Sequence, residues 1–360
     1  MVNSWSVTEW SIGCFRSPLN GPGASCSLWL RCWWVCLGSL GDEDVVCTTT
    51  GRPVLLAILG PTATGKSSLA LSVAEALDGE IISCDSTAVY RGFDIGTDKV
   101  PLAVRRGVPH HLVDVADPTE VYTAARYSRD AAQVVRAVTA RNRLPIVVGG
   151  TGLYYRALTR GLFPGPERDT DLRTRLHRVA EQRGVASLHR WLAARDPVSA
   201  NRIQPRDQKR LVRALEVWLL TGRPLSAHFD ATRSPIADYS VIAVGLRLPG
   251  ELLEARITQR VDSQFASGLL EEIRSLWQNG VPSDAGPFSG LVYRQAVEHL
   301  RGVRDEPATR DLIVRENRRY ARRQLTWFRK EPDLQWLEMP GERPDCCARV
   351  VQLLEKARLD

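Results

Sequence analysis

Short, mostly apolar runs alternate with longer segments of helical spacing between residues 52 and 163. The runs cover residues 54–59, 80–84 and 144–148, and each is followed by a loop that begins with glycine or aspartate. Runs of this length are typical of strands that are buried on both faces of a parallel sheet. Residues 123–140 instead show the apolar stripe of an amphipathic helix. The alternation predicts an α/β fold in which helices flank a parallel sheet.

The pattern changes after residue 166, where strand-like runs vanish and helical spacing takes over. We expect helices over residues 171–183, 187–195 and 206–221. The last of these ends at Gly222 with Pro224 beyond it, which is a common C-terminal signal. Residues 239–248 predict a last sheet strand, and helices follow to about residue 331. The predicted parts are a core over 51–166 and 231–340, an all-helical insertion over 167–230, and a C-terminal tail over 341–360.

Length and composition limit the classes of protein to consider. The chain has 360 residues, which suggests two domains at roughly 150 residues each. Hydrophobic residues make up 44% and charged residues 25%, values that exclude collagen-like, wholly disordered and fibrous coiled-coil proteins. No apolar stretch is long enough to predict a helix that crosses a membrane.

The first fifty residues differ in composition from the rest. They hold five of the eight cysteines and five of the ten tryptophans. The three remaining cysteines suit a protein of the reducing cytoplasm. Glu9, and the absence of Lys and Arg from the first fifteen residues, argue against a secretory signal. We interpret residues 1–50 as a poorly ordered extension, with Val45, Val46 or Val54 as alternative translation starts.

A phosphate-binding loop follows the first apolar run. Its pattern, G-x-x-x-x-G-K-[ST], is formed by Gly60, Pro61, Thr62, Ala63, Thr64, Gly65, Lys66 and Ser67. The glycines let the backbone approach an oxyanion, and amides at the start of a helix bind phosphate oxygens. Lys66 adds a positive charge, and the Ser67 hydroxyl can bind Mg²⁺. The loop predicts a P-loop NTPase-like core but does not distinguish a nucleotide from another diphosphate.

Polar residues at the ends of the next two strands point to the same crevice. Asp85 follows residues 80–84, and Thr151 follows residues 144–148. An Asp at the carboxyl end of a parallel strand can bind Mg²⁺ through water or accept a proton from a substrate amine. It can equally cap a helix. The pair His110–His111 has no further histidine nearby, so we interpret His111 as the start of a short strand rather than a metal ligand.

Basic residues gather on two predicted helices. The net charge is only +7, but seven of the sixteen residues over 315–330 are basic and only Glu316 is acidic. Residues 206–221 place Lys209, Arg210 and Arg213 beside an apolar face. Such stripes bind polyanions or simply form solvated helix faces.

Five motifs in order resemble those of the tRNA dimethylallyltransferases, also called isopentenyl-tRNA transferases, over about residues 54–337. They lie at residues 60–67, 83–97, 149–154, 207–216 and 322–329. The resemblance implies that a prenyl diphosphate occupies the loop, with Mg²⁺ as cofactor. It implies transfer of a dimethylallyl group to the exocyclic amine of the adenine 3′-adjacent to the anticodon, in tRNAs reading codons that begin with U. It also implies that the insertion binds the anticodon stem-loop of tRNA, and we expect a monomer.

The resemblance also implies roles for single residues. Asp85 receives the proton from the adenine amine, and Thr62, Lys66 and Arg260 act on the diphosphate, which residues 62–67 hold. Contacts with tRNA are implied for residues 289–294 and for Asp85, Ser86, Thr87, Ala88, Thr151, Arg173, Lys209, Arg210, Leu211, Val212 and Arg213.

Departures from the family pattern leave alternatives open. Val292 stands where the family has a glycine able to take positive φ, so we expect a shifted loop there. A zinc finger is not expected, because Cys346 and Cys347 are adjacent and unaccompanied. The alternatives are an adenylate (AMP, ADP or ATP) prenyltransferase, a small-molecule P-loop kinase, or an RNA-binding module with a degenerate loop. The basic helices, which a small acceptor would not need, favour tRNA.

Overall fold

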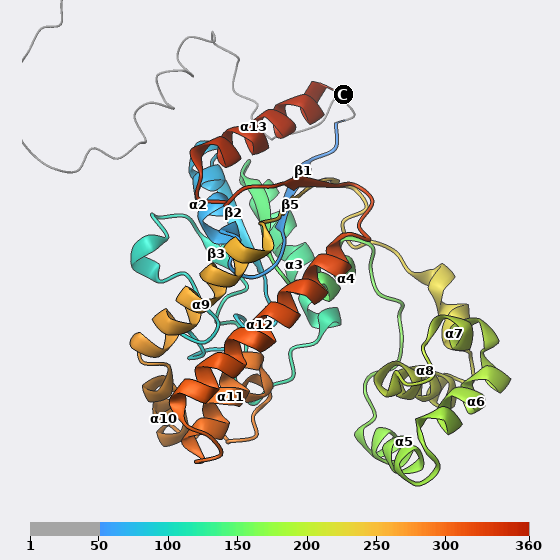
Figure 1. Cartoon of the computed structure of the whole chain (residues 1–360). Helices are drawn as coiled ribbons and strands as arrows, with labels where there is room; N and C mark the ends of the chain where they lie inside the picture. Colours follow the sequence, from blue (N-terminus) through green and yellow to red (C-terminus); the bar gives the residue numbers. More distant parts are fainter. Residues whose placement is uncertain (1–50, 360) are drawn as a thin grey trace, which may run out of the picture. The chain divides into compact units, whose positions relative to one another are not determined.

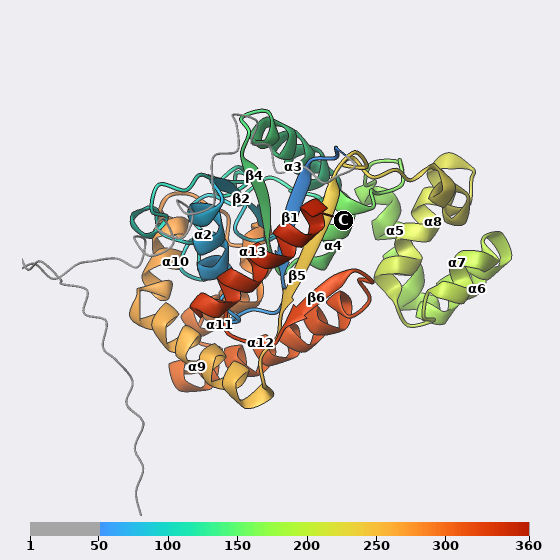
Figure 2. The same cartoon turned by 90° about the horizontal axis from the view of Figure 1, so that it is seen from above.

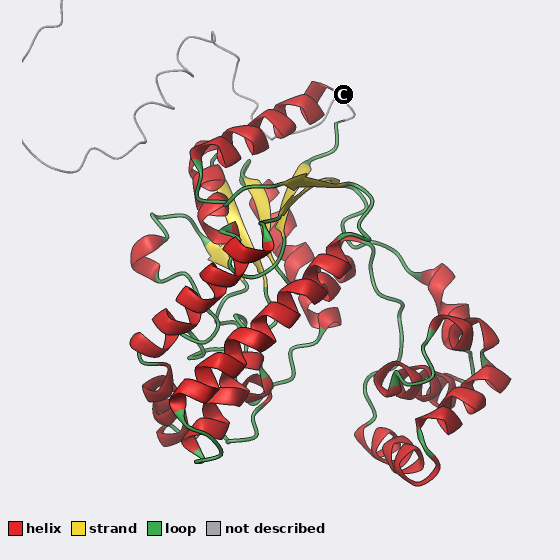
Figure 3. Cartoon of the chain, in the orientation of Figure 1, coloured by secondary structure: helices red, strands yellow, loops and turns green. Residues whose placement is uncertain are grey.

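A six-stranded parallel sheet forms the centre of the computed structural model, which describes residues 51–359 (Figures 1 and 3). The extension that we predicted over residues 1–50 lies outside the described residues. The strand order is β3-β2-β4-β1-β5-β6. The strands are β1 (Val54–Leu59), β2 (Gly79–Cys84), β3 (His110–His111), β4 (Leu144–Gly149), β5 (Ser240–Leu246) and β6 (Leu334–Leu337). The predicted α/β fold is confirmed, and β1 is an interior strand as expected.

Alternating side chains of the strands face two separate buried layers. Leu55 and Leu59 of β1 pack with α3 (Ala124–Thr139) and α4 (Gly152–Thr159). Leu56 and Ile58 pack instead with α2 (Lys66–Ala76) and α13 (Pro344–Leu359), which contact each other (Figure 2). Burial of β1 on both faces explains why its sequence has no polar position.

The register brings three strand ends to one edge of the sheet. Gly149 at the end of β4 pairs with Leu59 of β1 and with Cys84 of β2. The phosphate loop follows Leu59 and Asp85 follows Cys84 directly, and Thr151 lies two positions after Gly149. They therefore leave the sheet side by side, as the sequence predicted.

The remaining core helices follow the insertion. They are α9 (Gly250–Ala266), α10 (Leu269–Gln278), α11 (Leu291–Leu300) and α12 (Glu306–Phe328). Val292 lies in the first turn of α11 and is buried, without positive φ. A right-handed helix accepts valine, so this position does not need the positive φ that a glycine could take.

Three segments differ from the sequence predictions. The short strand ends at His111 instead of starting there, because Leu112 and Asp114 have φ values of 58° and 59°. The strand at residues 239–248 is not the last one, since β6 follows it at the sheet edge. Residues 341–360, which we expected to form a tail, contain α13, which buries Cys346, Val350 and Leu354 against the sheet.

The insertion is a small helical unit with its own core. It contains α5 (Thr170–Arg183), α6 (Val185–Arg195), α7 (Pro197–Arg202) and α8 (Gln208–Thr221). Aspartates start three of these helices: Asp169, Asp196 and Asp207 each accept a hydrogen bond from an amide in the first turn. Leucines from α5, α6 and α8 pack together. Within residues 51–359, no helix is both long and apolar enough to span a bilayer.

Candidate active site

A cavity of about 1150 Å³ opens at the edge where β1, β2 and β4 end. The phosphate loop forms one wall, and Asp85 with its following turn forms another. Helices α9 and α12 supply polar side chains to the same cavity, including Arg260 and Gln324. The loop and Asp85, which the sequence predicted separately, therefore belong to one site.

The phosphate loop connects β1 to α2, where the sequence predicted it. Ala63 and Gly65 take left-handed φ values of 62° and 86°. Gly60 has no room for a side chain, because a Cβ there would lie 2.7 Å from the Leu246 carbonyl oxygen. The buried Thr64 hydroxyl donates to the Pro61 carbonyl oxygen at 3.0 Å. Alternating right- and left-handed residues of this kind turn successive amides toward one concave side.

Lys66 lies at the start of α2 and titrates near neutral pH. Its Nζ donates to the Pro61 carbonyl oxygen at 2.6 Å. Burial, followed by the charge of Arg260, lowers the Lys66 pKa to about 7, although the Asp85 carboxylate opposes the shift. The lysine is therefore poised to gain a proton when an anion binds beside it.

Arg260 of α9 reaches the loop from the opposite side. Its Nη1 donates to the Thr62 hydroxyl at 2.5 Å, and its Nε pairs with Asp98. Burial raises the pKa of Asp98, despite the opposing effects of Arg260 and Gln264. These two contacts fix the Arg260 side chain beside the phosphate loop. The residues alone gave no reason for this position, which only the family resemblance implied.

Gln324 is a buried site residue that we did not predict. Its Oε1 accepts from the Thr62 amide at 3.0 Å, and its Nε2 donates to the Gly150 carbonyl oxygen at 3.0 Å. It therefore ties the loop after β1 to the loop after β4. A polar residue on the buried face of α12, next to Ala321 and Phe328, was the available signal.

Asp85 uses one carboxylate oxygen to form the turn after β2. Its Oδ1 accepts from the Thr87 amide at 2.8 Å, the Thr87 hydroxyl at 2.6 Å and the Ala88 amide at 3.3 Å. Among the described residues, no group hydrogen-bonds to Oδ2. One oxygen thus holds a turn, and the helix cap that the sequence left open is not formed, because no helix follows Asp85. Asp85 itself lines the cavity.

Thr151 and Tyr320 lie beside this turn. The Thr151 hydroxyl oxygen accepts from the Ser86 amide at 3.2 Å. Tyr320 of α12 lines the cavity, and burial together with the Asp85 charge raises the Tyr320 pKa to about 12. The phenol therefore stays protonated next to Asp85. Tyr320 is a second cavity residue that we did not predict, because we considered only the basic side chains of this helix.

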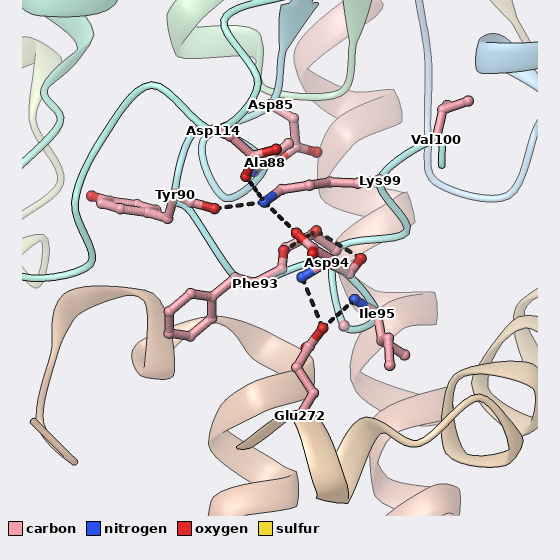
Figure 4. A network of polar contacts seen from close by, with 12 residues as sticks. Asp85, Ala88, Tyr90, Phe93, Asp94, Ile95, Lys99, Val100, Asp114 and Glu272 are labelled. Atoms are coloured by element: carbon pink, nitrogen blue, oxygen red, sulfur yellow. Dashed lines mark hydrogen bonds and ion pairs between the residues drawn. The ribbon is translucent and has the colours of Figure 1, made fainter. Parts of the chain in front are cut away.

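Lys99 anchors the loop that follows Asp85 (Figure 4). Its Nζ donates to the Tyr90 carbonyl oxygen at 2.6 Å, to Asp94 at 2.7 Å and to Asp114 at 2.5 Å. Glu272 of α10 holds the same loop by accepting from the Asp94 amide at 3.0 Å and the Ile95 amide at 2.8 Å. We did not predict this role for Lys99; the rarity of lysine in this arginine-rich chain was the only available signal.

Two arginines of the insertion bind a buried glutamate. Glu216 is 0% exposed and accepts from Arg173 at 2.7 Å and from Arg213 at 2.7 Å. Burial opposes ionisation of Glu216, but the hydrogen bonds from these arginines and the Asp169 amide outweigh it and lower its pKa to about 2. Arg173 and Arg213, for which the resemblance implied tRNA contacts, thus already have a structural role.

The other insertion residues expected at tRNA divide into two groups. Leu211 and Val212 are 0% and 1% exposed, because their side chains face the core of the insertion. Lys209 and Arg210 are exposed, and Arg210 pairs only at 3.2 Å with the neighbouring Asp207. Helix α12 also exposes Arg315, Arg319, Arg322 and Arg323.

Known proteins resemble most of the chain. The IPP transferase family model matches residues 88–331. A relative from Solibacter usitatus, named tRNA dimethylallyltransferase, is 46% identical over 291 residues, which are 81% of this chain and 94% of the relative. A relative of the same name from Geobacter metallireducens is 46% identical over 80% of this chain and 93% of its own length.

Solved structures agree with these relatives. The tRNA isopentenylpyrophosphate transferase of Bacillus halodurans is 36% identical, with a TM-score of 0.62 over 84% of this chain and 97% of that one. A eukaryotic dimethylallyltransferase acting on tRNA is 26% identical, with a TM-score of 0.69 over 83% of this chain and 77% of that one.

Proposed function

The chain belongs to the IPP transferase family, and from this premise we propose which donor and which adenine its tRNA-prenylating activity uses. The donor is dimethylallyl diphosphate. The acceptor is the exocyclic amine of the adenine 3′-adjacent to the anticodon, in tRNAs reading codons that begin with U. One observation carries the proposal: the phosphate loop and Asp85 line the same cavity, and the hydrogen bonds of the Asp85 turn use only Oδ1.

The donor half of the site neutralises the leaving diphosphate. Lys66, the loop amides and Arg260 would surround the negative charge that grows as the bond to the prenyl carbon breaks. The Thr62 hydroxyl accepts a hydrogen bond from Arg260, so its own proton is free to be donated to a phosphate oxygen. Gln324 already binds the Thr62 amide, so that amide acts by holding the loop rather than by binding the donor.

The residues present fit a magnesium ion bound together with the diphosphate. Ser67 lines the cavity at the first turn of α2 and would be the protein ligand. A magnesium ion bound with a diphosphate is held mainly by phosphate oxygens and water. Bound there, Mg²⁺ would add positive charge to the leaving group.

The acceptor half of the site receives the adenine. The base must leave its stack to reach the cavity. Asp85 Oδ2 would then accept the proton that the exocyclic amine loses on attack, while Oδ1 keeps the turn in place. The exposed arginines of α12 and the exposed Lys209 and Arg210 of the insertion would bind tRNA phosphates.

A smaller acceptor or a kinase reaction is not favoured. An adenylate prenyltransferase or a small-molecule P-loop kinase would use the loop and Asp85 but would leave the basic helices without a role. The relatives are named for action on tRNA. We also propose that the protein works as a monomer in the cytoplasm, where the buried, unpaired Cys84, Cys346 and Cys347 would stay reduced.

The choice of donor is tested by direct binding. We expect dimethylallyl diphosphate to bind in the presence of Mg²⁺ and to be displaced by inorganic diphosphate. ATP should compete poorly, because the pocket must leave room for an adenine that comes from the acceptor. Calorimetric titration with both ligands measures this preference. Tighter binding of ATP than of dimethylallyl diphosphate would contradict the proposed donor.

Diphosphate binding should take up a proton at Lys66. The free lysine has a pKa of about 7, and a bound diphosphate raises it. Above pH 7 the free side chain is mostly neutral, so affinity should fall as pH rises, by up to about tenfold per pH unit. Titration at pH 8 in buffers of different ionisation enthalpy measures the uptake. The control is Lys66→Arg, which stays protonated; equal uptake in both proteins would refute the assignment.

Binding of tRNA should depend on Arg210 through charge. We expect Arg210→Ala to weaken tRNA binding and to reduce the slope of log K against log salt by roughly one unit, because one phosphate contact is lost. Arg274→Ala is the matched control, since Arg274 is a half-exposed arginine on α10 with a similar acidic neighbour. An unchanged salt slope for Arg210→Ala would remove this residue from the tRNA surface.

A further inference from the structure

The loop between β6 and α13 is packed against the phosphate loop. The Gly341 amide donates to the Thr64 carbonyl oxygen at 3.0 Å. A Cβ on Gly341 would lie only 2.3 Å from the Gly65 carbonyl oxygen. From the other side, a Cβ on Gly65 would lie 2.6 Å from a carboxylate oxygen of Glu342. The backbone of Gly341 therefore lies against the backbone of Gly65 with no space for a methyl group, while the Glu342 side chain lies over Gly65.

Arg256 of α9 joins the same contact. Its Nε donates to the Ala63 carbonyl oxygen at 2.8 Å, and its Nη2 pairs with the Glu342 carboxylate. Ala63 is a non-glycine residue at φ 62°, a conformation that costs free energy and persists only when the surroundings hold it. One guanidinium thus connects this costly turn to the loop that precedes α13.

Three carbonyl groups of the phosphate loop are therefore held by hydrogen bonds, two of them from outside the loop. Arg256 binds the carbonyl of Ala63, Gly341 binds that of Thr64, and Lys66 and the Thr64 hydroxyl bind that of Pro61. Fixing these carbonyls sets the orientation of the peptide planes, and with it the direction of the amides on the same planes. The loop amides can bind phosphate only when they point to one concave side.

We propose that residues 339–343 are a positioning element of the donor site, which together with Arg256 fixes the shape of the phosphate loop. The inference rests on the proposed function, in which that loop binds the diphosphate. Glu342 and Arg256 also line the cavity, whereas Gly341 does not and acts on the donor through the shape of the loop. Their effect is on how well the donor fits, and tRNA binding does not depend on them.

Gly341→Ala tests the inference without changing any charge. The added methyl group must push the Gly65 carbonyl away, and displacement of a binding group by about 1 Å can cost on the order of 10²-fold. We expect the Kd for inorganic diphosphate with Mg²⁺, measured by calorimetry, to rise by about that factor. The Kd for tRNA should stay within about twofold, and thermal melting should remain cooperative.

Gly250→Ala is the matched control. Gly250 begins α9, has no positive φ, and a Cβ there would meet nothing within 4 Å. It should bind diphosphate and tRNA as the unmodified chain does.

Arg256→Lys is an independent second variant. Lysine keeps the positive charge but cannot hold a carbonyl and a carboxylate at once in the planar geometry of arginine. We expect diphosphate binding at least fivefold weaker and tRNA binding unchanged. In the double variant Gly341→Ala/Arg256→Lys, the loss of diphosphate affinity should differ from the sum of the two single losses in free energy, because both changes act through the same loop.

The outcomes separate this inference from the proposed function. If the unmodified chain bound no diphosphate, the proposed donor site would be wrong and the inference would fall with it. If the unmodified chain bound diphosphate and both variants stayed within twofold of it, only the inference would be overturned. If Gly341→Ala no longer melted cooperatively, the test would rest on Arg256→Lys alone. A diphosphate Kd of Arg256→Lys within twofold of that of the unmodified chain would then overturn the inference.

Discussion

Replacing Asp85 by asparagine is expected to lower turnover by about 10²–10⁴-fold while tRNA affinity stays near normal. The amine of adenine is a poor nucleophile, and its attack needs a nearby acceptor for the proton it loses. Asparagine keeps an oxygen that can accept the hydrogen bonds from Thr87 and Ala88, so the turn should survive. Only the proton acceptor would be lost. Single-turnover rates with saturating donor and tRNA measure the effect.

Asp117→Asn is a closely matched control for this variant. Asp117 forms the same kind of turn, since its Oδ1 accepts from the Thr119 amide at 3.0 Å and the Thr119 hydroxyl at 2.6 Å. It does not line the cavity. We expect it to leave turnover unchanged. If Asp85→Asn instead abolished magnesium–diphosphate binding with little effect on the later step, Asp85 would belong to the metal site, and its role as the base would be wrong.

Lys66→Ala is expected to reduce turnover by about 10²–10³-fold, because the charge that develops on the diphosphate would lose its nearest cation. Part of the loss should appear as weaker donor binding, and the rest as a slower step at saturating donor. Steady-state rates over a range of donor concentrations separate the two. Lys356→Ala, at an exposed lysine of α13, is the control. Full turnover of Lys66→Ala at saturating donor would show that the lysine plays no part in the chemistry.

Local sequence patterns predicted the parts of the site that depend on neighbours in the chain. The phosphate loop was predicted because a buried strand, the loop residues and an amphipathic helix follow one another directly. Asp85 was predicted because the carboxyl ends of parallel strands meet at one sheet edge. Both predictions depend on backbone rules that operate over fewer than about 20 residues.

Contacts between distant segments could not be predicted in this way. Gln324 binds the amide of Thr62 across 262 positions, and Arg260 reaches the Thr62 hydroxyl across 198. Strand β6 was missed because its four residues include both buried and exposed positions, too few to establish a period. The helix α13 did leave a signal, since Cys346, Val350 and Leu354 recur every four residues.

Leu211 shows how helical periodicity and family resemblance can disagree. Its spacing with Ala214 and Leu215 placed it on the apolar face of α8, whereas the resemblance implied contact with tRNA. The structure buries its side chain in the core of the insertion. The burial follows from the apolar stripe of α8, which decides how the helix packs. A family motif that is carried over as a block also includes residues whose side chains support its exposed members.

The most direct test of the central claim is transfer of a labelled dimethylallyl group from its diphosphate. The acceptors compared should be unmodified tRNA, the same tRNA with guanine replacing the adenine 3′-adjacent to the anticodon, and free AMP, ADP and ATP. Label should enter only the unmodified tRNA and should be recovered in the anticodon loop as a prenylated adenosine. Equal labelling of the guanine-containing tRNA, or faster labelling of a free adenine nucleotide, would contradict the account.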